Sequence, residues 1–436
     1  MRALRVLIIV AGFEFVLAVA AHASLQEDAQ KAFRQHRFEE VIRLLESAPP
    51  DYKLTSDTLR TGVNSALRIG RPDTALAFYA RLVPPNASDE TPLLRDTALA
   101  VLTARVRDTQ EHLRIAAYMV LADVAAKDTL PILKDGLLDV SIMVRARAAE
   151  GLARAGAPAS MIARALDDEM PSVRIAALNA LGPHIDPGLR PAITRLSKSE
   201  EGVVHIFALT ALARMGQADA ADDIAVEATL PNADVRMAAL GALGRLKRPS
   251  SLSLLNQAVY DPDPSVRAFA AGALGDFGDP NSHAALLHTL QDDHPRVRSI
   301  AAASLGRLKL PQSRPVLKQA ARDPIEWVRI GAVEGLLRMG DDEAVLLAAD
   351  LAKHPDPSVR GATAQAVGLS GNRKARQVLE TLLKDQQPQP RLMAARALGR
   401  LGGHEGLTIL KPAMRDPDPA VSLAAAGSVL QLLSTK

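Results

Sequence analysis

Apolar and polar residues follow one another along most of this chain with the spacing of paired amphipathic helices, and the pair recurs every 31 residues. Residues 261–278, DPDPSVRAFAAGALGDFG, show the unit most plainly, because a polar turn precedes Val266, Ala270 and Leu274 on one helical face. The Arg after Val266 marks a register position, which recurs at Arg114, Arg145, Arg174, His205, Arg236, Arg267, Arg298, Arg329, Arg360, Arg391 and Ser422. One step is 29 residues and nine are 31, so eleven units are predicted. Since no such unit buries its apolar face alone, the pattern predicts an all-α solenoid of stacked helical hairpins.

Each unit is predicted to be a helix, a turn and a second helix, and polar residues mark the turn. Pro fits the first turn of a helix and Asp caps free backbone N–H groups, so a turn of this composition ends one helix and begins the next. Gly recurs eleven residues after the register position, as at Gly278, where the second helix needs a left-handed ending. Asp stands six residues before the register position in eight units, at Asp108, Asp139, Asp168, Asp261, Asp292, Asp323, Asp385 and Asp416.

The motif [DP]-x-x-VR-x-x-AA-x-ALG-x-[LF]-G covers about residues 92–436 and resembles HEAT repeats, in particular the short bacterial kind also found in phycobilin lyases. The resemblance implies a right-handed superhelix whose second helices line the concave side. At about 8–10 Å per packed helix, eleven units would extend over on the order of 100 Å.

Residues 24–88 have a different period, with His36 matching Gly70 and Leu45 matching Tyr79 at an offset of 34. This period and the G-x-[YF]-x-x-A…P skeleton resemble the tetratricopeptide family, with His36 replacing one Gly, and imply two helical hairpins. The Pro- and Asp-containing stretch 84–92 is predicted to be the boundary loop before the solenoid.

The first 23 residues have the organisation of a bacterial signal peptide. Arg2 and Arg5 precede an apolar run, and Ala21-His22-Ala23 forms a cleavage site, so the mature chain is expected to begin at Ser24 in the periplasm or outside the cell. Retention of this segment as an anchor stays open. After cleavage we expect a monomer without a membrane span, and because Cys is absent the fold must hold by packing alone.

Composition argues against several classes of function. Aromatic residues are 3% of the chain, and Lys plus Arg exceed Asp plus Glu by only 52 to 49, so nucleic acid is not an expected partner. No zinc, P-loop or nucleophile-elbow motif occurs, and no catalytic residue, metal or cofactor is predicted. One enzyme of HEAT-like build, deoxyhypusine hydroxylase, holds iron with several His-Glu pairs, whereas this chain has only His404-Glu405.

The register Arg lies beside the apolar stripe of its helix, so it is expected to be partly buried at the seam between units. There it would bridge turn carboxylates or carbonyls of neighbouring units, because partly buried charges require partners. A row of anion-binding sites is the alternative interpretation. The predicted structural ladder includes Asp261, Arg267, Asp292, Arg298, Asp323, Arg329, Asp385 and Arg391.

A second Arg column, nine residues after the register position, is predicted to point away from the core. Such residues either complement the helix dipole or bind a partner. With the apolar residues one position after the register and the single Trp, they suggest a groove that binds another protein. An accessory enzyme or lyase-like protein holding a small ligand or chromophore is the alternative. The predicted partner-binding residues are Arg154, Arg214, Arg245, Arg307, Arg338, Arg400, Trp327, Ile175, Ile206, Met237 and Ile330.

Overall fold

The computed structural model of the protein describes residues 25–49, 52–84 and 87–434, and these residues form helices and connecting turns with no strand. They divide into two compact units, one ending at Ala104 and the other beginning at Arg105. The predicted signal peptide lies outside the described residues. None of the described helices is long and apolar enough to cross a membrane.

The first unit contains the two expected hairpins and one further helix. Its helices are residues 25–34, α2 (Phe38–Glu46), α3 (Ser56–Arg68), α4 (Pro72–Leu82) and α5 (Thr91–Thr103). His36 and Gly70 occupy equivalent turns and both have positive φ, 58° and 68°, so the His stands where the repeat calls for a left-handed residue. Helix α5 lies within the stretch whose sequence resembles HEAT repeats, and its contacts group it with these hairpins.

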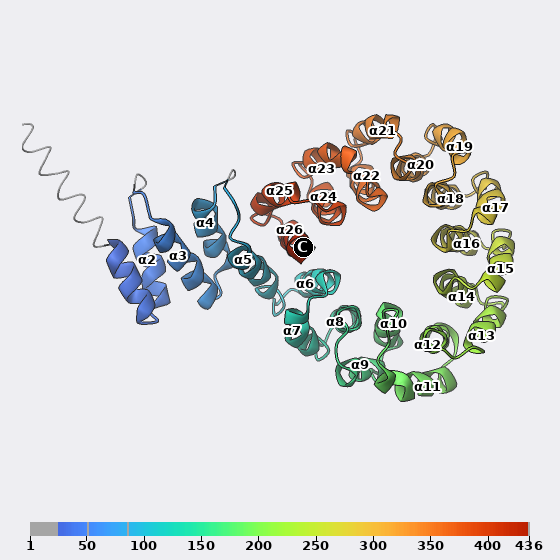
Figure 1. The fold of residues 1–436 in the computed structure, drawn as a ribbon, viewed down its shortest axis with the longest axis horizontal. Coiled ribbons are helices and arrows are strands. Elements are labelled where there is room, and N and C mark those ends of the chain that lie inside the picture. Colours follow the sequence, from blue (N-terminus) through green and yellow to red (C-terminus); the bar gives the residue numbers. More distant parts are fainter. Residues whose placement is uncertain (1–24, 50–51, 85–86, 435–436) are drawn as a thin grey trace, which may run out of the picture. The chain divides into compact units, whose positions relative to one another are not determined.

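The second unit is a solenoid of alternating inner and outer helices (Figure 1). The inner helices carry the register positions, as the resemblance implied, and they are α6 (Glu111–Val124), α8 (Ile142–Arg154), α10 (Pro171–Ala180), α12 (Gly202–Arg214), α14 (Ala233–Leu246), α16 (Pro264–Phe277), α18 (Pro295–Leu308), α20 (Glu326–Arg338), α22 (Pro357–Ser370), α24 (Pro388–Leu401) and α26 (Pro419–Ser434). The outer helices are α7 (Leu130–Gly136), α9 (Ala159–Leu166), α11 (Arg190–Ser199), α13 (Ala220–Glu227), α15 (Leu252–Ala258), α17 (His283–Thr289), α19 (Ser313–Ala320), α21 (Glu343–Leu351), α23 (Arg376–Leu382) and α25 (Glu405–Ala413). Single 3-10 turns, η1 (Lys127–Thr129), η2 (Pro187–Leu189), η3 (Pro249–Ser251), η4 (Pro280–Ser282) and η5 (Arg373–Ala375), lead into five of the outer helices.

Turn chemistry sets the ends of the inner helices as the sequence indicates. Asp263 caps α16 by accepting a hydrogen bond from Ser265 N at 2.7 Å, and Pro264 occupies the first turn. The helix ends at Gly278 with φ 79°, and Lys309 takes the same left-handed conformation after α18. The core behind these helices is built from small aliphatic residues such as Ala270, Ala271 and Leu274, which are fully buried.

Inner helices pack directly on their inner neighbours, whereas outer helices make few contacts with one another. Small residues permit this close approach. An added Cβ at Gly306 in α18 would lie 2.1 Å from the Cα of Gly335 in α20, so the two backbones meet without side chains between them. A stack that is narrower inside than outside must curve, and the curvature accumulates over the eleven units.

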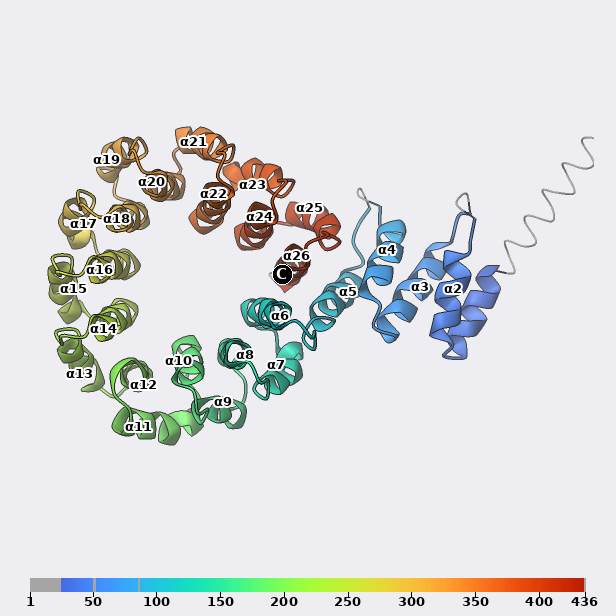
Figure 2. The same ribbon diagram turned by 180° about the vertical axis from the view of Figure 1, so that it is seen from behind.

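The curvature closes the second unit into a ring, in which α26 packs against α6 (Figures 1 and 2). The Asp123 carboxylate accepts hydrogen bonds from Arg396 in α24 at 2.5 Å and from Arg154 in α8 at 3.1 Å. Gln431 Nε2 of α26 donates to Asp123 O at 3.4 Å, and the backbone of α26 approaches Val120 of α6. The predicted all-α solenoid is therefore confirmed, and because its two ends touch, the eleven units form a closed ring and not an open stack.

Candidate functional site

The surface that the inner helices present to the centre of the ring is the candidate binding site, and we call it the inner face. It consists of the positions two residues before and two, five and nine residues after the register position, which lie within about 60° of one another on a helix at 100° per residue. Several large apolar side chains on it are exposed to solvent, with 44% of Phe269, 45% of Trp327 and 40% of Leu369 accessible. Exposed apolar side chains grouped on one surface are typical of binding sites.

The predicted apolar contact residues differ in how much of their surface is accessible. Ile206 is fully buried, Ile330 is 7% exposed, and Ile175 and Met237 are half-buried. The position one residue after the register lies about 100° round the helix, so it lies toward the adjacent inner helix. Ile206 therefore offers no accessible surface to a partner, whereas Ile330 lines the cavity described below.

The sequence analysis missed the position two residues after the register, which supplies Phe207, Phe269 and Ile300 to the inner face. The same 100° arithmetic places it at 200°, directly opposite the core, so this signal was available in the sequence. It also missed Leu369, which replaces Arg in the predicted column.

The six predicted Arg residues separate into two groups of three. Arg154, Arg245 and Arg400 are exposed. The others are half-buried and hold main-chain oxygens of neighbouring inner helices: Arg214 Nη1 donates to Leu181 O at 2.8 Å, Arg307 Nη1 to Gly272 O at 3.3 Å, and Arg338 donates to Leu369 O. Three residues of this column thus have structural contacts to neighbouring main chain, and their mutation would also disturb the fold.

Arg214 and Arg245 concentrate positive charge on one part of the inner face. Neither has a described carboxylate within ion-pair distance, although the charge of Asp276 acts on Arg245. The Arg245 guanidinium lies 5.6 Å from the centre of the Phe207 ring. Desolvation lowers the pKa of both side chains, and the charge of Arg214 lowers the pKa of Arg245 further. A guanidinium remains charged at neutral pH despite such shifts, so this region favours an anionic group.

The register Arg residues form a ladder along the turns of the ring. Arg267 illustrates a rung: Nε and Nη2 donate to Asp292 Oδ2 and Oδ1 at 2.6 and 3.0 Å, while Nη1 donates to Asp261 O at 2.9 Å. The guanidinium thus joins the turn of its own unit to the carboxylate of the next. Pairs of the same kind are Arg114–Asp139, Arg145–Asp168, Arg236–Asp261, Arg298–Asp323, Arg360–Asp385 and Arg391–Asp416.

The rungs are saturated with internal partners, which leaves little for an anionic ligand. Asp292 also accepts a hydrogen bond from His294 N, and the Arg267 guanidinium holds the pKa of the Asp292 carboxyl below its usual range. Arg329 departs from the pattern, because His354 stands where the next unit would supply Asp, and Arg329 pairs instead with Glu326 at 3.1 Å. His205 and Ser422 replace the Arg and bond to main-chain oxygens of Ser197 and Met414.

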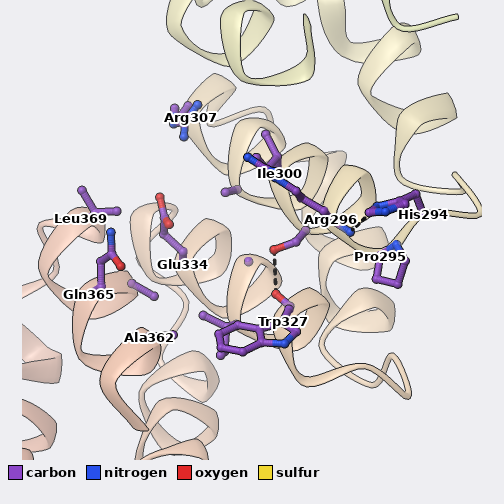
Figure 3. A pocket seen from close by; sticks show the side chains of 15 residues that line it. His294, Pro295, Arg296, Ile300, Arg307, Trp327, Glu334, Ala362, Gln365 and Leu369 are labelled. Carbon is purple, nitrogen blue, oxygen red and sulfur yellow. Dashed lines mark hydrogen bonds between the residues drawn. The ribbon is translucent and has the colours of Figure 1, made fainter. Parts of the chain in front are cut away.

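The inner face is hollowed between α18, α20 and α22, where a cavity of about 740 Å³ opens (Figure 3). Each of the three helices contributes one large apolar side chain to its wall: Ile300 from α18, Trp327 from α20 and Leu369 from α22. Helix α18 also contributes Arg296 and Arg307. The backbone oxygen of Trp327 accepts a hydrogen bond from Ser299 Oγ at 2.7 Å, which ties the Trp to the neighbouring helix. The volume lies within the range of about 300–1,000 Å³ that is usual for ligand pockets.

No site for metal-dependent chemistry is visible in the part of the chain that the structure describes. None of its His, Asp and Glu residues gather in groups of three or more that could hold an ion. The inner face offers apolar side chains, guanidinium groups and the carboxylates of Asp123, Glu150, Asp234, Asp276 and Glu334. Glu334, the carboxylate that lines the cavity, pairs with Arg338 at 3.3 Å.

Comparison with known proteins supports the repeat assignment. The family model for HEAT repeats matches residues 222–305, 283–353 and 344–431. No curated protein matches the sequence.

Several solved structures resemble the chain in fold. The complex of CpcE and CpcF of phycocyanin lyase from Nostoc is 18% identical, with 57% of this chain and 96% of that chain covered and a TM-score of 0.39. Human deoxyhypusine hydroxylase is 20% identical over 51% of this chain and 98% of its own, with a TM-score of 0.27. The structure of Kap121p bound to Nup53p is 14% identical over 84% of this chain and 51% of its own, with a TM-score of 0.35. These values are too low to carry an argument about activity.

Proposed function

Because this chain belongs to the HEAT-repeat proteins, we propose that it is a non-enzymatic scaffold whose inner face binds a segment of another protein. The observation that carries the proposal is the exposure of Phe269, Trp327 and Leu369 beside Arg245 on one continuous set of inner helices. Apolar side chains interleaved with guanidinium groups suit an amphipathic segment with acidic residues.

The experiment places a photo-crosslinking amino acid, benzoylphenylalanine, at Phe269 in living cells and identifies the crosslinked protein by mass spectrometry. Tyr260, which is exposed beyond α15, an outer helix, provides the matched control. We expect one partner to crosslink from Phe269 and not from Tyr260. Equal crosslinking from both positions, or none from Phe269, would contradict the proposal.

A charge reversal then tests the role of the basic residues. Arg245→Glu is expected to reduce binding of the identified partner at least tenfold, because Arg245 is exposed and has no ion-pair partner among the described carboxylates. Arg164→Glu on the outer helix α9 carries the same charge change and should leave binding unchanged. Similar losses in both variants would show that net charge matters and the inner face does not.

We also propose that the protein is exported and that residues 1–23 are removed, on the basis of Arg2, Arg5 and the Ala21-His22-Ala23 site. The intact mass of the protein recovered from the periplasmic fraction tests this. A mass that includes the first 23 residues would instead indicate a retained anchor.

A small ligand in the cavity of about 740 Å³ is a second candidate function, favoured by the exposed Trp327 at its side. Native mass spectrometry of the freshly purified protein distinguishes the two. A stoichiometric low-mass adduct, or a visible absorption band, would favour the small ligand over the protein segment.

A further inference from the structure

The cavity between α18, α20 and α22 is the most strongly differentiated part of the inner face. Trp327 is the only Trp in the chain, and the same register position carries Ser172, Ser265 and Ser358 in other units. The repeat therefore does not require a large aromatic side chain here. Exposing almost half of a Trp gains nothing for folding, whereas burying it in a complex is a frequent source of binding energy.

The walls of the cavity are apolar and come from three consecutive helices. Ile300 and Leu369 face it from either side of Trp327, and the small side chain of Ala362 lines the space beside them (Figure 3). The cavity is large enough for one or two bulky side chains of a peptide. Its position on inner helices makes it continuous with the Phe269 and Arg245 region along the ring.

The charged residues at the rim of the cavity decide which charge is favoured next to an inserted apolar side chain. Arg296 is exposed and forms no ion pair with a described carboxylate, whereas Arg307 forms an ion pair with Asp276 at 3.3 Å. The one carboxylate in the lining, Glu334, is met by Arg338 at 3.3 Å. Arg296 thus leaves one unpaired positive charge at the rim, which attracts a carboxylate that flanks an inserted apolar side chain.

We propose that this cavity is the anchor point for an acidic peptide segment, which inserts one or two bulky apolar side chains beside Trp327 and directs a flanking Asp or Glu carboxylate to Arg296. The proposal rests on the proposed function and specifies the chemistry of the partner. A second copy of the chain and a cationic peptide are the occupants that the experiment distinguishes from it.

A phage-displayed library of random short peptides is panned against the full-length protein and, in parallel, against Trp327→Ser. The Ser variant is a sound control because sister units carry Ser at this position without loss of their helices. We expect peptides enriched on the parent protein relative to Trp327→Ser to contain an aromatic residue or Leu flanked by Asp and Glu. Enrichment of Lys- and Arg-rich peptides, or no enrichment over the Ser variant, overturns the proposal.

Binding of an enriched peptide that lacks Trp is then followed through the fluorescence of Trp327, which reports on this cavity alone. Burial of the ring is expected to shift its emission to shorter wavelength in a saturable manner. Arg296→Glu should weaken the acidic peptide at least tenfold and improve binding of the same peptide with Glu replaced by Lys, whereas Arg164→Glu should change neither. If Arg296→Glu weakens binding of both peptides equally, the proposed role of its charge is wrong. If light scattering shows that two copies of the protein associate without peptide, self-association is favoured over peptide binding.

The anchor proposal and the scaffold proposal fail separately. Crosslinking from Phe269 combined with an unresponsive Trp327 leaves the scaffold intact and refutes the anchor. Loss of both signals refutes the scaffold as well.

Discussion

The closure of the ring depends on Gly427, and its replacement by Ala is predicted to open the joint between α6 and α26. A Cβ added at Gly427 would lie 2.1 Å from Val120 Cγ1. Ordinary contact between carbon atoms is about 3.5–4.0 Å, so the two helices would have to separate by roughly 1.5 Å at this point. Overpacking of this kind costs about 1–3 kcal/mol, which corresponds to a roughly 5- to 150-fold shift from closed to open rings.

Two substitutions provide matched comparisons. Gly272 has the same register position on α16, and a Cβ there meets only Ile300 Cγ2 at 3.6 Å. Gly272→Ala should therefore leave the ring closed and add about 0.5–1 kcal/mol of helix stability. Val120→Ala removes the Cγ1 atom that clashes with Ala at position 427. The remaining neighbours, the Cβ of residue 120 at 3.6 Å and Val124 Cγ2 at 3.7 Å, are at ordinary contact distance, so the ring of the double variant should close again.

The assay is a distance measurement by pulsed electron paramagnetic resonance between spin labels at Lys134→Cys and Thr408→Cys. Both residues are exposed on α7 and α25, the outer helices beside the joint, and the chain has no native Cys to remove. A single narrow distribution is expected for the parent, a longer and broader one for Gly427→Ala, and the narrow one again for the double variant. An unchanged distribution in Gly427→Ala would refute the reasoning.

A disulfide offers an independent check of the same joint. The ideal Cβ at position 427 lies 3.6 Å from Val120 Cβ, within the range of about 3.5–4.5 Å found in disulfides. Val120→Cys with Gly427→Cys should therefore oxidise to an internal crosslink that non-reducing electrophoresis detects. Failure to crosslink under oxidising conditions would argue that the joint is open in solution.

Two further predictions concern the Arg and Asp ladder. His354→Asp should complete the missing rung to Arg329 and raise the free energy of unfolding by about 0.5–1 kcal/mol, visible as a higher urea midpoint, and a lower midpoint would contradict it. Arg267 and Arg360 hold the pKa of Asp292 and Asp385 below the ordinary value, so this stabilisation is present above the unfolded-state pKa of about 3.9 and is lost as pH falls through the folded-state pKa. The melting temperature should fall below about pH 4, with a smaller fall in Asp292→Asn, and a melting temperature independent of pH between about 5 and 3 would exclude this role.

Local features of the repeat could be predicted because the residues that determine each of them lie within a single repeat unit. The turn before α16, the left-handed ending at Gly278 and the position of Arg267 at the seam follow from spacing and from helix arithmetic. Family resemblance added the placement of the second helices on the inside. The burial of Ile206 could not be predicted in this way, because it is covered by neighbouring helices that a single-helix projection does not include.

Ring closure could not be predicted in the same way, because it depends on a small rotation per unit accumulated over eleven units. Two signals in the sequence were nevertheless present. Helix α26 is apolar on every side, with residues 423–430 all buried, whereas the last helix of an open stack needs a polar outer surface. Gly427 within that helix marks a place where another backbone comes close.

A linear array of repeats loses structure first at its two extremities, where the outermost units have a neighbour on one side only. Here α6 and α26 cover each other, so neither inner extremity is free to fray, and partial melting must begin by parting a joint that Asp123, Arg396 and Gly427 hold together. The amide hydrogens of α6 and α26 should consequently exchange with deuterium as slowly as those of α16, in the middle of the array.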